Sequence, residues 1–214
     1  MKNQTEGQRL FLYGHGKGKN MGLNNCYDPR KYVDKILSGN LPHWEQPGVM
    51  QFITFRLAHS LPQSKILALK EERDEWLRQH PQPWSFKDQL EYEELFNKNE
   101  EWLDKGYGEC LLTIPEIQHL VEDSLRYHDG IRYDLFDFII MPNHVHILII
   151  PAIGYECTGI VKSIKGFSGL KINKLLKRKG QVWERESWDR MIRSPADYAA
   201  KAEYIKHNGD CLVS

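Results

Sequence analysis

Residues 132–151, with the sequence RYDLFDFIIMPNHVHILIIP, decide the fold of this chain. β-Branched and aromatic residues dominate both halves of the stretch, and Pro142 and Asn143 between them are typical turn residues. This pattern predicts two antiparallel strands joined by a tight turn. Because side chains along a strand alternate between the two faces of a sheet, we expect His144 and His146 to project from the same face.

The two histidines are the sharpest chemical feature of the sequence. Val145, Ile147 and Ile149 fill the other face of the same strand, so the imidazoles lie in an otherwise apolar segment. Unpaired polar groups are costly in such surroundings, and a divalent metal ion would bind both rings. The alternative is a chance pair, with one ring hydrogen-bonded and the other solvated, because isolated histidine pairs predict metal sites poorly.

A second polar pair lies in the segment AEYIKHN. Tyr204 and Asn208 are four residues apart and therefore stack on one face of the helix predicted there. The amide oxygen of Asn208 and two imidazoles would form an incomplete shell around a divalent ion, leaving positions for phosphate oxygens. Tyr204 would be the nucleophile, since a phenol with a pKa of about 10 needs a metal or base beside it. Alternatively, Tyr204 is a half-buried core ring and Asn208 an ordinary residue at the helix end.

The stretch from Ile160 to Arg193 is basic, with ten Lys and Arg residues against three acidic ones. Its first part has apolar residues at helical spacing and lysines on the opposite face, which predicts an amphipathic helix. Such a helix either follows a phosphate backbone or presents a solvated face. The candidate nucleic-acid contacts are Lys162, Lys165, Lys171, Arg190 and Arg193.

The overall composition indicates one folded domain. The chain has 214 residues, 41% of them hydrophobic, and no net charge, so its bulk electrostatics do not favour a polyanionic partner. Its four cysteines are scattered without metal-binding spacing, which favours a reducing cytoplasm over a disulfide framework. Apolar runs stay shorter than the roughly 20 residues that cross a bilayer, so we expect no membrane span.

Residues 1–47 show neither helical nor strand periodicity, so we expect an N-terminal arm or loop before a domain that covers residues 48–214. Within that domain, the segment at about 64–105 contains eleven acidic residues against seven basic ones. Its apolar residues recur at helical spacing, which predicts a helical insertion with a solvated acidic face.

Turn and capping residues set the limits of the expected elements. Thr113 with Glu116 three residues later predicts a capping box, and Ser194 with Pro195 predicts an N-cap and a first helical position. The expected strands cover 49–57, 132–141 and 145–150, and the expected helices cover about 66–80, 86–103, 115–128, 160–179 and 195–208.

Four segments together resemble the single-tyrosine transposases of the HUH superfamily, specifically the branch associated with repetitive extragenic palindromes (REP). In order, they are LPHWEQPGVMQFITFRLAHSLP, FDFIIMPNHVHILIIP, IVKSIKGFSGLKINKLLKRKGQVWERESWDRMIR and YAAKAEYIKHN. The resemblance implies an α+β fold, with a ferredoxin-like or RRM-like central antiparallel sheet and helices on one face. It matches His144 and His146 to the family's metal motif, Tyr204 to its nucleophile and Asn208 to its third metal-side residue.

The resemblance also implies an activity. It is that of a metal-dependent single-strand DNA endonuclease and strand transferase, which forms a 5′-phosphotyrosine at hairpin-flanked DNA with Mg²⁺ or Mn²⁺. The partners would be single-stranded or hairpin DNA, and a homodimer in which the Tyr204 helix acts in cis or in trans is left open. A competing class is a non-catalytic hairpin-binding module with an RRM-like sheet, which would tolerate EDTA. A third is a metal-stabilised α+β scaffold without salt-dependent DNA affinity.

Overall fold

The computed structural model contains a five-stranded antiparallel sheet in the order β1-β5-β6-β4-β7 and a separate hairpin, β2-β3. It describes residues 12–16, 22, 25–38, 41–81, 85, 87–88, 90–92, 94–95, 103 and 108–208. The strands are β1 (Leu12–His15), β2 (Asp34–Ser38), β3 (Leu41–Glu45), β4 (Gln51–Arg56), β5 (Tyr133–Ile140), β6 (His144–Pro151) and β7 (Trp188–Met191). The helices are α1 (Gln63–Gln79), the 3₁₀ turn η2 (Leu111–Thr113), α3 (Pro115–Arg126), α4 (Cys157–Leu175) and α5 (Pro195–His207).

The central part of the sheet has a ferredoxin-like connectivity. β4, α3, β5, β6, α4 and β7 follow one another in the chain as β-α-β-β-α-β, and the strands pair in the order β7-β4-β6-β5. β1 extends this sheet at the edge of β5, and α1 is inserted between β4 and α3. The predicted α+β class with a ferredoxin-like antiparallel sheet is therefore confirmed.

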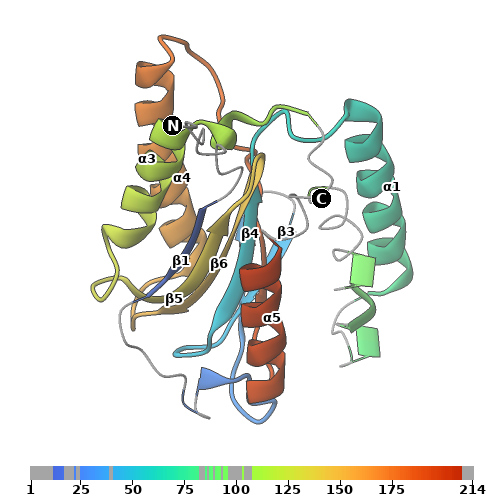
Figure 1. Cartoon of the computed structure of the whole chain (residues 1–214). Helices are drawn as coiled ribbons and strands as arrows, with labels where there is room; N and C mark the ends of the chain where they lie inside the picture. Colours follow the sequence, from blue (N-terminus) through green and yellow to red (C-terminus); the bar gives the residue numbers. More distant parts are fainter. Residues whose placement is uncertain are drawn as a thin grey trace.

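Alternation along the strands separates two hydrophobic clusters. Ile53 of β4 and Ile147 of β6 belong to the larger cluster, which includes the inner residues of α3 and α4. Phe52 of β4 and Leu148 of β6 belong to a smaller cluster with Ile205 of α5. Figure 1 shows α3 and α4 on one side of the sheet and α5 on the other. The prediction of helices on one face is therefore wrong for α5, because both faces of the central strands carry apolar side chains that need cover.

The N-terminal region contributes strands as well as loops. β1 pairs with β5, from Leu12 opposite Ile140 to His15 opposite Asp137. β2 and β3 pair with each other. The prediction of an arm or loop over residues 1–47 is therefore wrong for these three strands, whereas the domain limits stay a prediction. Each strand is only four or five residues long, which is too short to show a clear period.

The two predicted helix starts differ in outcome. At the start of α5, Ser194 Oγ accepts a hydrogen bond from Asp197 N at 3.1 Å, so the predicted N-cap is confirmed. At α3 the N-cap position is Ile114, and no side chain caps the helix. The capping box at Thr113 is wrong, because its hydroxyl instead donates to Cys110 O at 2.7 Å within the turn of η2.

The predicted helical insertion begins with α1, whereas much of the second expected helix, at 86–103, lies outside the described residues. The last helix, predicted over 195–208, ends at His207 with Asn208 as its C-cap. β7 forms where the sequence predicted no element, and it extends the sheet beside β4. Within the described part of the chain, no helix combines the length and apolar character that crossing a membrane requires.

Candidate active site

His144 and His146 lie side by side on β6, on the face of the sheet that α5 covers. Both residues are fully buried, and their Nε2 atoms are 2.9 Å apart. Strand pairing places His146 opposite Thr54 of β4 and His144 opposite Arg56. The two imidazoles therefore converge, as the alternation of side chains along a strand predicts.

A second contact orients each imidazole. His144 Nδ1 lies 2.7 Å from the amide oxygen of Asn143. Since that oxygen only accepts, the proton of a neutral ring sits on Nδ1, and the Nε2 lone pair faces His146. His146 Nδ1 lies 2.8 Å from Thr54 Oγ1. A hydroxyl both donates and accepts, so Thr54 serves either tautomer of His146. Both rings are thus held with Nε2 toward the same point.

The spacing of the two nitrogens fits a divalent cation. Two nitrogen ligands that stand about 2.1 Å from an octahedral ion, at a right angle, lie about 3 Å apart. The observed separation of the two Nε2 atoms is 2.9 Å. Metal-binding histidines usually donate their other ring N–H to an oxygen, and Asn143 and Thr54 offer such oxygens here. The residues present therefore fit a metal ion.

Tyr204 of α5 lies against the histidine pair within the same chain. Its ring centroid is 5.3 Å from that of His146 and 6.2 Å from that of Phe52, both edge to face. Phe52 in turn stacks on His146, with the two ring centroids 5.3 Å apart. The Tyr204 side chain is half-buried rather than enclosed in the core. α5 thus brings a phenol to the imidazoles without a second chain.

Polar contacts in its first turn fix α5 on the sheet. Arg190 of β7 donates to both carboxylate oxygens of Asp197, at 2.5 and 3.1 Å. Burial raises the pKa of Asp197, but the hydrogen bonds from Arg190 and from the backbone of Arg193, with the nearby positive charges, together lower it more. Tyr198 donates to Asp137 of β5 at 3.3 Å. These contacts tie the helix to two strands and so position Tyr204 about two turns later.

Lys201 of α5 and Asn208 at its end both contact Tyr204. Lys201 Nζ is 5.0 Å from the ring centroid of Tyr204 and 4.5 Å from that of Phe52, so a positive charge stands beside the tyrosine. Asn208 is 9% exposed at the end of α5, and its backbone N donates to Tyr204 O at 2.9 Å. Helical spacing places Asn208 on the same helix face as Tyr204. Its role as a metal ligand stays a prediction.

The predicted nucleic-acid contacts are divided between the two faces of the sheet, since Arg190 lies opposite Phe52 on the histidine face whereas the three lysines belong to α4. They are Lys162, Lys165 and Lys171 on α4, with Arg190 on β7 and Arg193 just after it. α4 packs on the face of the sheet opposite to the histidines. Lys165 Nζ donates to Arg185 O at 2.7 Å, and burial lowers the pKa of Lys165 to about 8. Arg190 binds Asp197, so both residues have structural partners, and DNA contact by all five stays a prediction.

Thr54, Phe52 and Lys201 are site residues that the sequence did not single out. Thr54 and Phe52 are distant from the histidines in the chain and reach them only because β4 pairs with β6. No local sequence pattern predicts the pairing of β4 with β6. Lys201 stands three residues before Tyr204, so helical spacing was a usable signal for it.

A separate group after α1 also has metal-ligand chemistry. A nitrogen of His80 and carboxylate oxygens of Asp88 and Glu91 lie within 4.8 Å of one another. All three residues are half-buried and belong to the insertion between β4 and α3. This group is therefore distinct from the pair on β6.

The fold and the site define an α+β protein with a ferredoxin-like sheet, a buried histidine pair and a tyrosine beside it. Residues 116–206, from α3 to α5, match the family model of the IS200-like transposases. The matched range contains His144, His146 and Tyr204. The match confirms the resemblance to single-tyrosine transposases.

Among solved structures, the chain is similar to a REP-associated tyrosine transposase bound to a REP hairpin. The two chains are 14% identical, and the likeness covers 87% of this chain and 74% of that chain with a TM-score of 0.38. A comparison with curated protein sequences finds no match.

Proposed function

We propose that this chain is a metal-dependent single-strand DNA endonuclease and strand transferase that forms a 5′-phosphotyrosine through Tyr204. The observation that carries the proposal is the phenol of Tyr204 beside His146, whose Nε2 lies 2.9 Å from that of His144. A weak nucleophile therefore lies next to two metal-ligand nitrogens, which is the combination that phosphoryl transfer by a phenol requires. The match of residues 116–206 to IS200-like transposases supports the same reaction.

In the proposed reaction, Tyr204 Oη attacks the scissile phosphorus. The bond from phosphorus to the 3′ oxygen of the preceding nucleotide breaks as the bond to Oη forms. The phenol loses its proton, and the departing 3′ oxygen gains one, which leaves a free 3′-OH. The phosphotyrosine is still a phosphodiester, so attack by a 3′-OH reverses the step and rejoins DNA without an external energy source. Lys201 supplies positive charge over the ring of Tyr204, which favours the negative phenolate that forms when the proton leaves.

We propose His144, His146 and Asn208 as ligands of the catalytic metal, Mg²⁺ or Mn²⁺. Such an ion supplies Lewis-acid polarisation of the scissile phosphate when it is bound. Asn143 and Thr54 hold the two imidazoles with their Nε2 atoms toward each other, where they would bind the ion. Phe52 stacks on His146 and excludes water from one side of that ring.

The substrate that we propose is single-stranded DNA next to a hairpin, as in the REP-associated branch. A folded-back palindrome offers a shape for recognition and an exposed strand for cleavage. A half-buried tyrosine beside a buried histidine pair would reach a phosphate only in an unpaired strand, which bends more readily than a duplex. We propose that the reaction takes place in the cytoplasm, because the scattered cysteines favour a reducing compartment.

The test is covalent capture. The protein is incubated with a hairpin flanked by single-stranded DNA and Mn²⁺, then resolved under denaturing conditions. We expect a protein–DNA adduct that EDTA prevents and that Tyr204→Phe abolishes, because phenylalanine lacks the attacking oxygen. Tyr155→Phe is the control, since Tyr155 is an exposed tyrosine in the loop before α4.

The same experiment separates the competing functions. An adduct that persists in Tyr204→Phe would contradict the nucleophile assignment. Hairpin binding that tolerates EDTA, together with no adduct from the wild-type protein, would instead identify a non-catalytic binding module. If the wild-type protein shows no salt-dependent affinity for DNA, the chain is a structural scaffold.

A further inference from the structure

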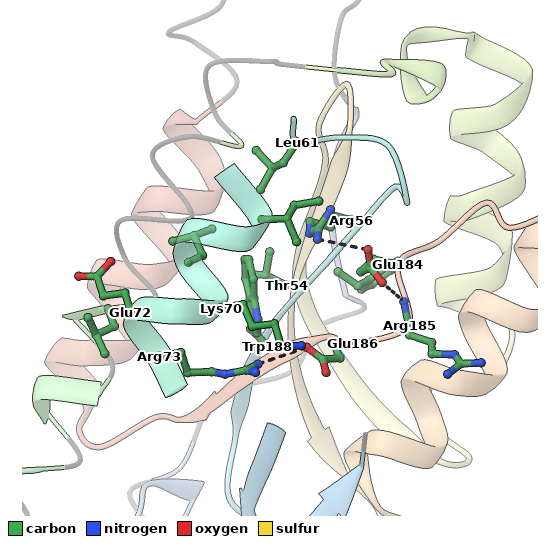
Figure 2. Close-up of a pocket in the computed structure, with 14 residues that line it drawn as sticks. Thr54, Arg56, Leu61, Lys70, Glu72, Arg73, Glu184, Arg185, Glu186 and Trp188 are labelled. Atoms are coloured by element: carbon green, nitrogen blue, oxygen red, sulfur yellow. Dashed lines mark hydrogen bonds and ion pairs between the residues drawn. The ribbon is translucent and has the colours of Figure 1, made fainter. Parts of the chain in front are cut away.

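A cleft of about 290 Å³ lies between α1 and the strands β4 and β7, and we refer to it as the α1 cleft. Thr54 and Arg56 of β4, Arg73 of α1 and Trp188 of β7 contribute to its walls. Figure 2 shows these side chains around the same space, with α1 on one side and the strands on the other. The size is at the lower limit of small-molecule sites, so it suits a single planar ring system rather than a duplex.

The α1 cleft adjoins the histidine pair. Trp188 lies opposite Thr54 in the pairing of β7 with β4, and Thr54 lies opposite His146 in the pairing of β4 with β6. Residues opposite one another in neighbouring strands share a face of the sheet, so all three are on the histidine face. Thr54 lines the cleft, and its hydroxyl is 2.8 Å from His146 Nδ1. One side chain therefore connects the cleft to the candidate active site.

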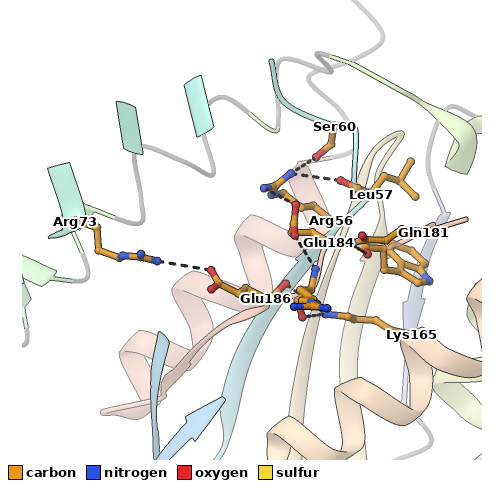
Figure 3. Close-up of polar contacts among 10 residues, drawn as sticks. Arg56, Leu57, Ser60, Arg73, Lys165, Gln181, Glu184 and Glu186 are labelled. Carbon is orange, nitrogen blue, oxygen red and sulfur yellow. Dashed lines mark hydrogen bonds and ion pairs between the residues drawn. The ribbon is translucent and has the colours of Figure 1, made fainter. Parts of the chain in front are cut away.

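The segment 184–186, which forms one wall of the α1 cleft, is held by contacts from several elements. Arg56 donates to Glu184 at 3.3 Å, and Arg73 Nη1 is 3.7 Å from Glu186. From the other side, Lys165 Nζ donates to the backbone oxygens of residues 185 and 186, at 2.7 and 3.3 Å. Figure 3 shows this set of contacts running from α1 across β4 to α4. These contacts fix the position of this wall of the cleft.

The chemistry of the α1 cleft matches a nucleobase better than a phosphate. Four cationic and three acidic side chains line it, and Arg56 and Arg73 each contact a glutamate. This balance gives little net attraction for a phosphate. Paired donors and acceptors beside an aromatic ring instead match the edge and the face of an unpaired base, since bases stack on aromatic side chains and glutamate accepts from exocyclic amino groups.

We propose that the α1 cleft binds an unpaired nucleobase of the substrate strand close to the scissile phosphate. The base stacks on Trp188, and Glu186 accepts a hydrogen bond from its exocyclic amino group, so adenine, cytosine and guanine bind in preference to thymine. Because Arg73 of α1 lines the cleft and contacts Glu186, the α1 insertion would help to select the cleavage position. This inference rests on the proposed nuclease function, because the base reaches the cleft only when its strand lies at Tyr204.

The test uses hairpin oligonucleotides with randomised single-stranded flanks and Mn²⁺. Covalent adducts of the wild-type protein are isolated, and the captured strands are sequenced. We expect one position near the cleavage point to disfavour thymine about tenfold. Glu186→Gln, which keeps the shape of the side chain but loses its charge, should reduce the preference at that position and leave other positions unchanged.

A second comparison uses an abasic nucleotide at the same position. The abasic substrate should react about tenfold more slowly with the wild-type protein, because stacking is lost. Trp188→Ala should react equally slowly with the abasic and intact substrates, whereas Trp188→Phe should keep the difference. Tyr127→Ala is the control, because Tyr127 is an exposed aromatic residue at the end of α3 on the other side of the sheet. Thermal unfolding of each variant checks that it is folded.

Two failures can be told apart. If no flank gives an adduct with the wild-type protein, the proposed function falls and the nucleobase site falls with it. If adducts form with a flat base preference, or if Glu186→Gln keeps the wild-type preference and Trp188→Ala keeps the abasic penalty, only the nucleobase site is overturned.

Discussion

The two faces of the central sheet are made by alternate residues of the same strands, yet they differ in chemistry. On β4, Ile53 packs into the large apolar cluster with α3 and α4, whereas its neighbour Thr54 contacts His146 on the α5 face. β6 repeats the pattern, with Ile147 on the first face and His146 on the second. A period of two therefore lets one strand pair supply the core on one side and the candidate chemistry on the other.

The α4 face has a polar exception at its edge. Glu45 of β3 is 8% exposed, and its carboxylate accepts a hydrogen bond from the backbone N of Cys157, at the start of α4, at 2.8 Å. The pKa of Glu45 is raised from 4.5 to about 7, chiefly by burial and also by the negative charges of Asp189 and Glu156, which together outweigh the lowering effect of the hydrogen bonds from the backbone of Cys157 and Thr158. The α4 face therefore serves mainly stability and the α5 face carries the candidate active site. Substitutions at the centre of the sheet and at Glu45 on its edge test this difference.

The largest expected effect is on the apolar face. Ile53→Ala should reduce the free energy of unfolding by about 3 kcal/mol, because it removes methyl groups from a fully buried position. Denaturant unfolding measures the loss. The affinity of the folded protein for Mn²⁺ should match the wild type, since Ile53 points away from the histidines. A large change in Mn²⁺ affinity would show that the two faces are not independent.

At the edge of that face, Glu45→Gln should alter how stability depends on pH. The carboxyl has a higher pKa in the folded chain than in the unfolded one, so its contribution is fully present below pH 4.5 and is lost as pH rises to about 7. Glutamine does not titrate and still accepts from Cys157 N. We expect the variant to lose about 2 kcal/mol less stability than the wild type between these pH values. Identical pH profiles in denaturant titrations would contradict the burial of a titrating Glu45.

The smallest expected effect is on the α5 face, at Thr54, the neighbour of Ile53. Thr54→Val removes the hydroxyl that holds His146 Nδ1, so Mn²⁺ affinity should fall about tenfold. Isothermal titration calorimetry with Mn²⁺ alone measures the change. Thr54→Ser keeps the hydroxyl and should restore most of the affinity. If Thr54→Val binds Mn²⁺ as tightly as the wild type, the contact does not orient a metal ligand.

Local patterns in the sequence identified the features that depend on near neighbours in the chain. The strands of the β5-β6 hairpin follow from their composition and the Pro-Asn turn, and the shared face of His144 and His146 follows from strand geometry. The start of α5 follows from Ser194, whose hydroxyl accepts from Asp197 N. Capping, turns and periodicity act over a few residues, so the sequence alone determines them.

The tertiary structure decided which distant segments meet. Only the pairing of β4 with β6 brings Thr54 to His146, and only the packing of α5 on the second face brings Tyr204 there. The short edge strand β1 likewise forms because a partner strand was available, not because its own residues demand it. These outcomes depend on which of many possible long-range contacts are most stable. Local sequence patterns do not predict that choice.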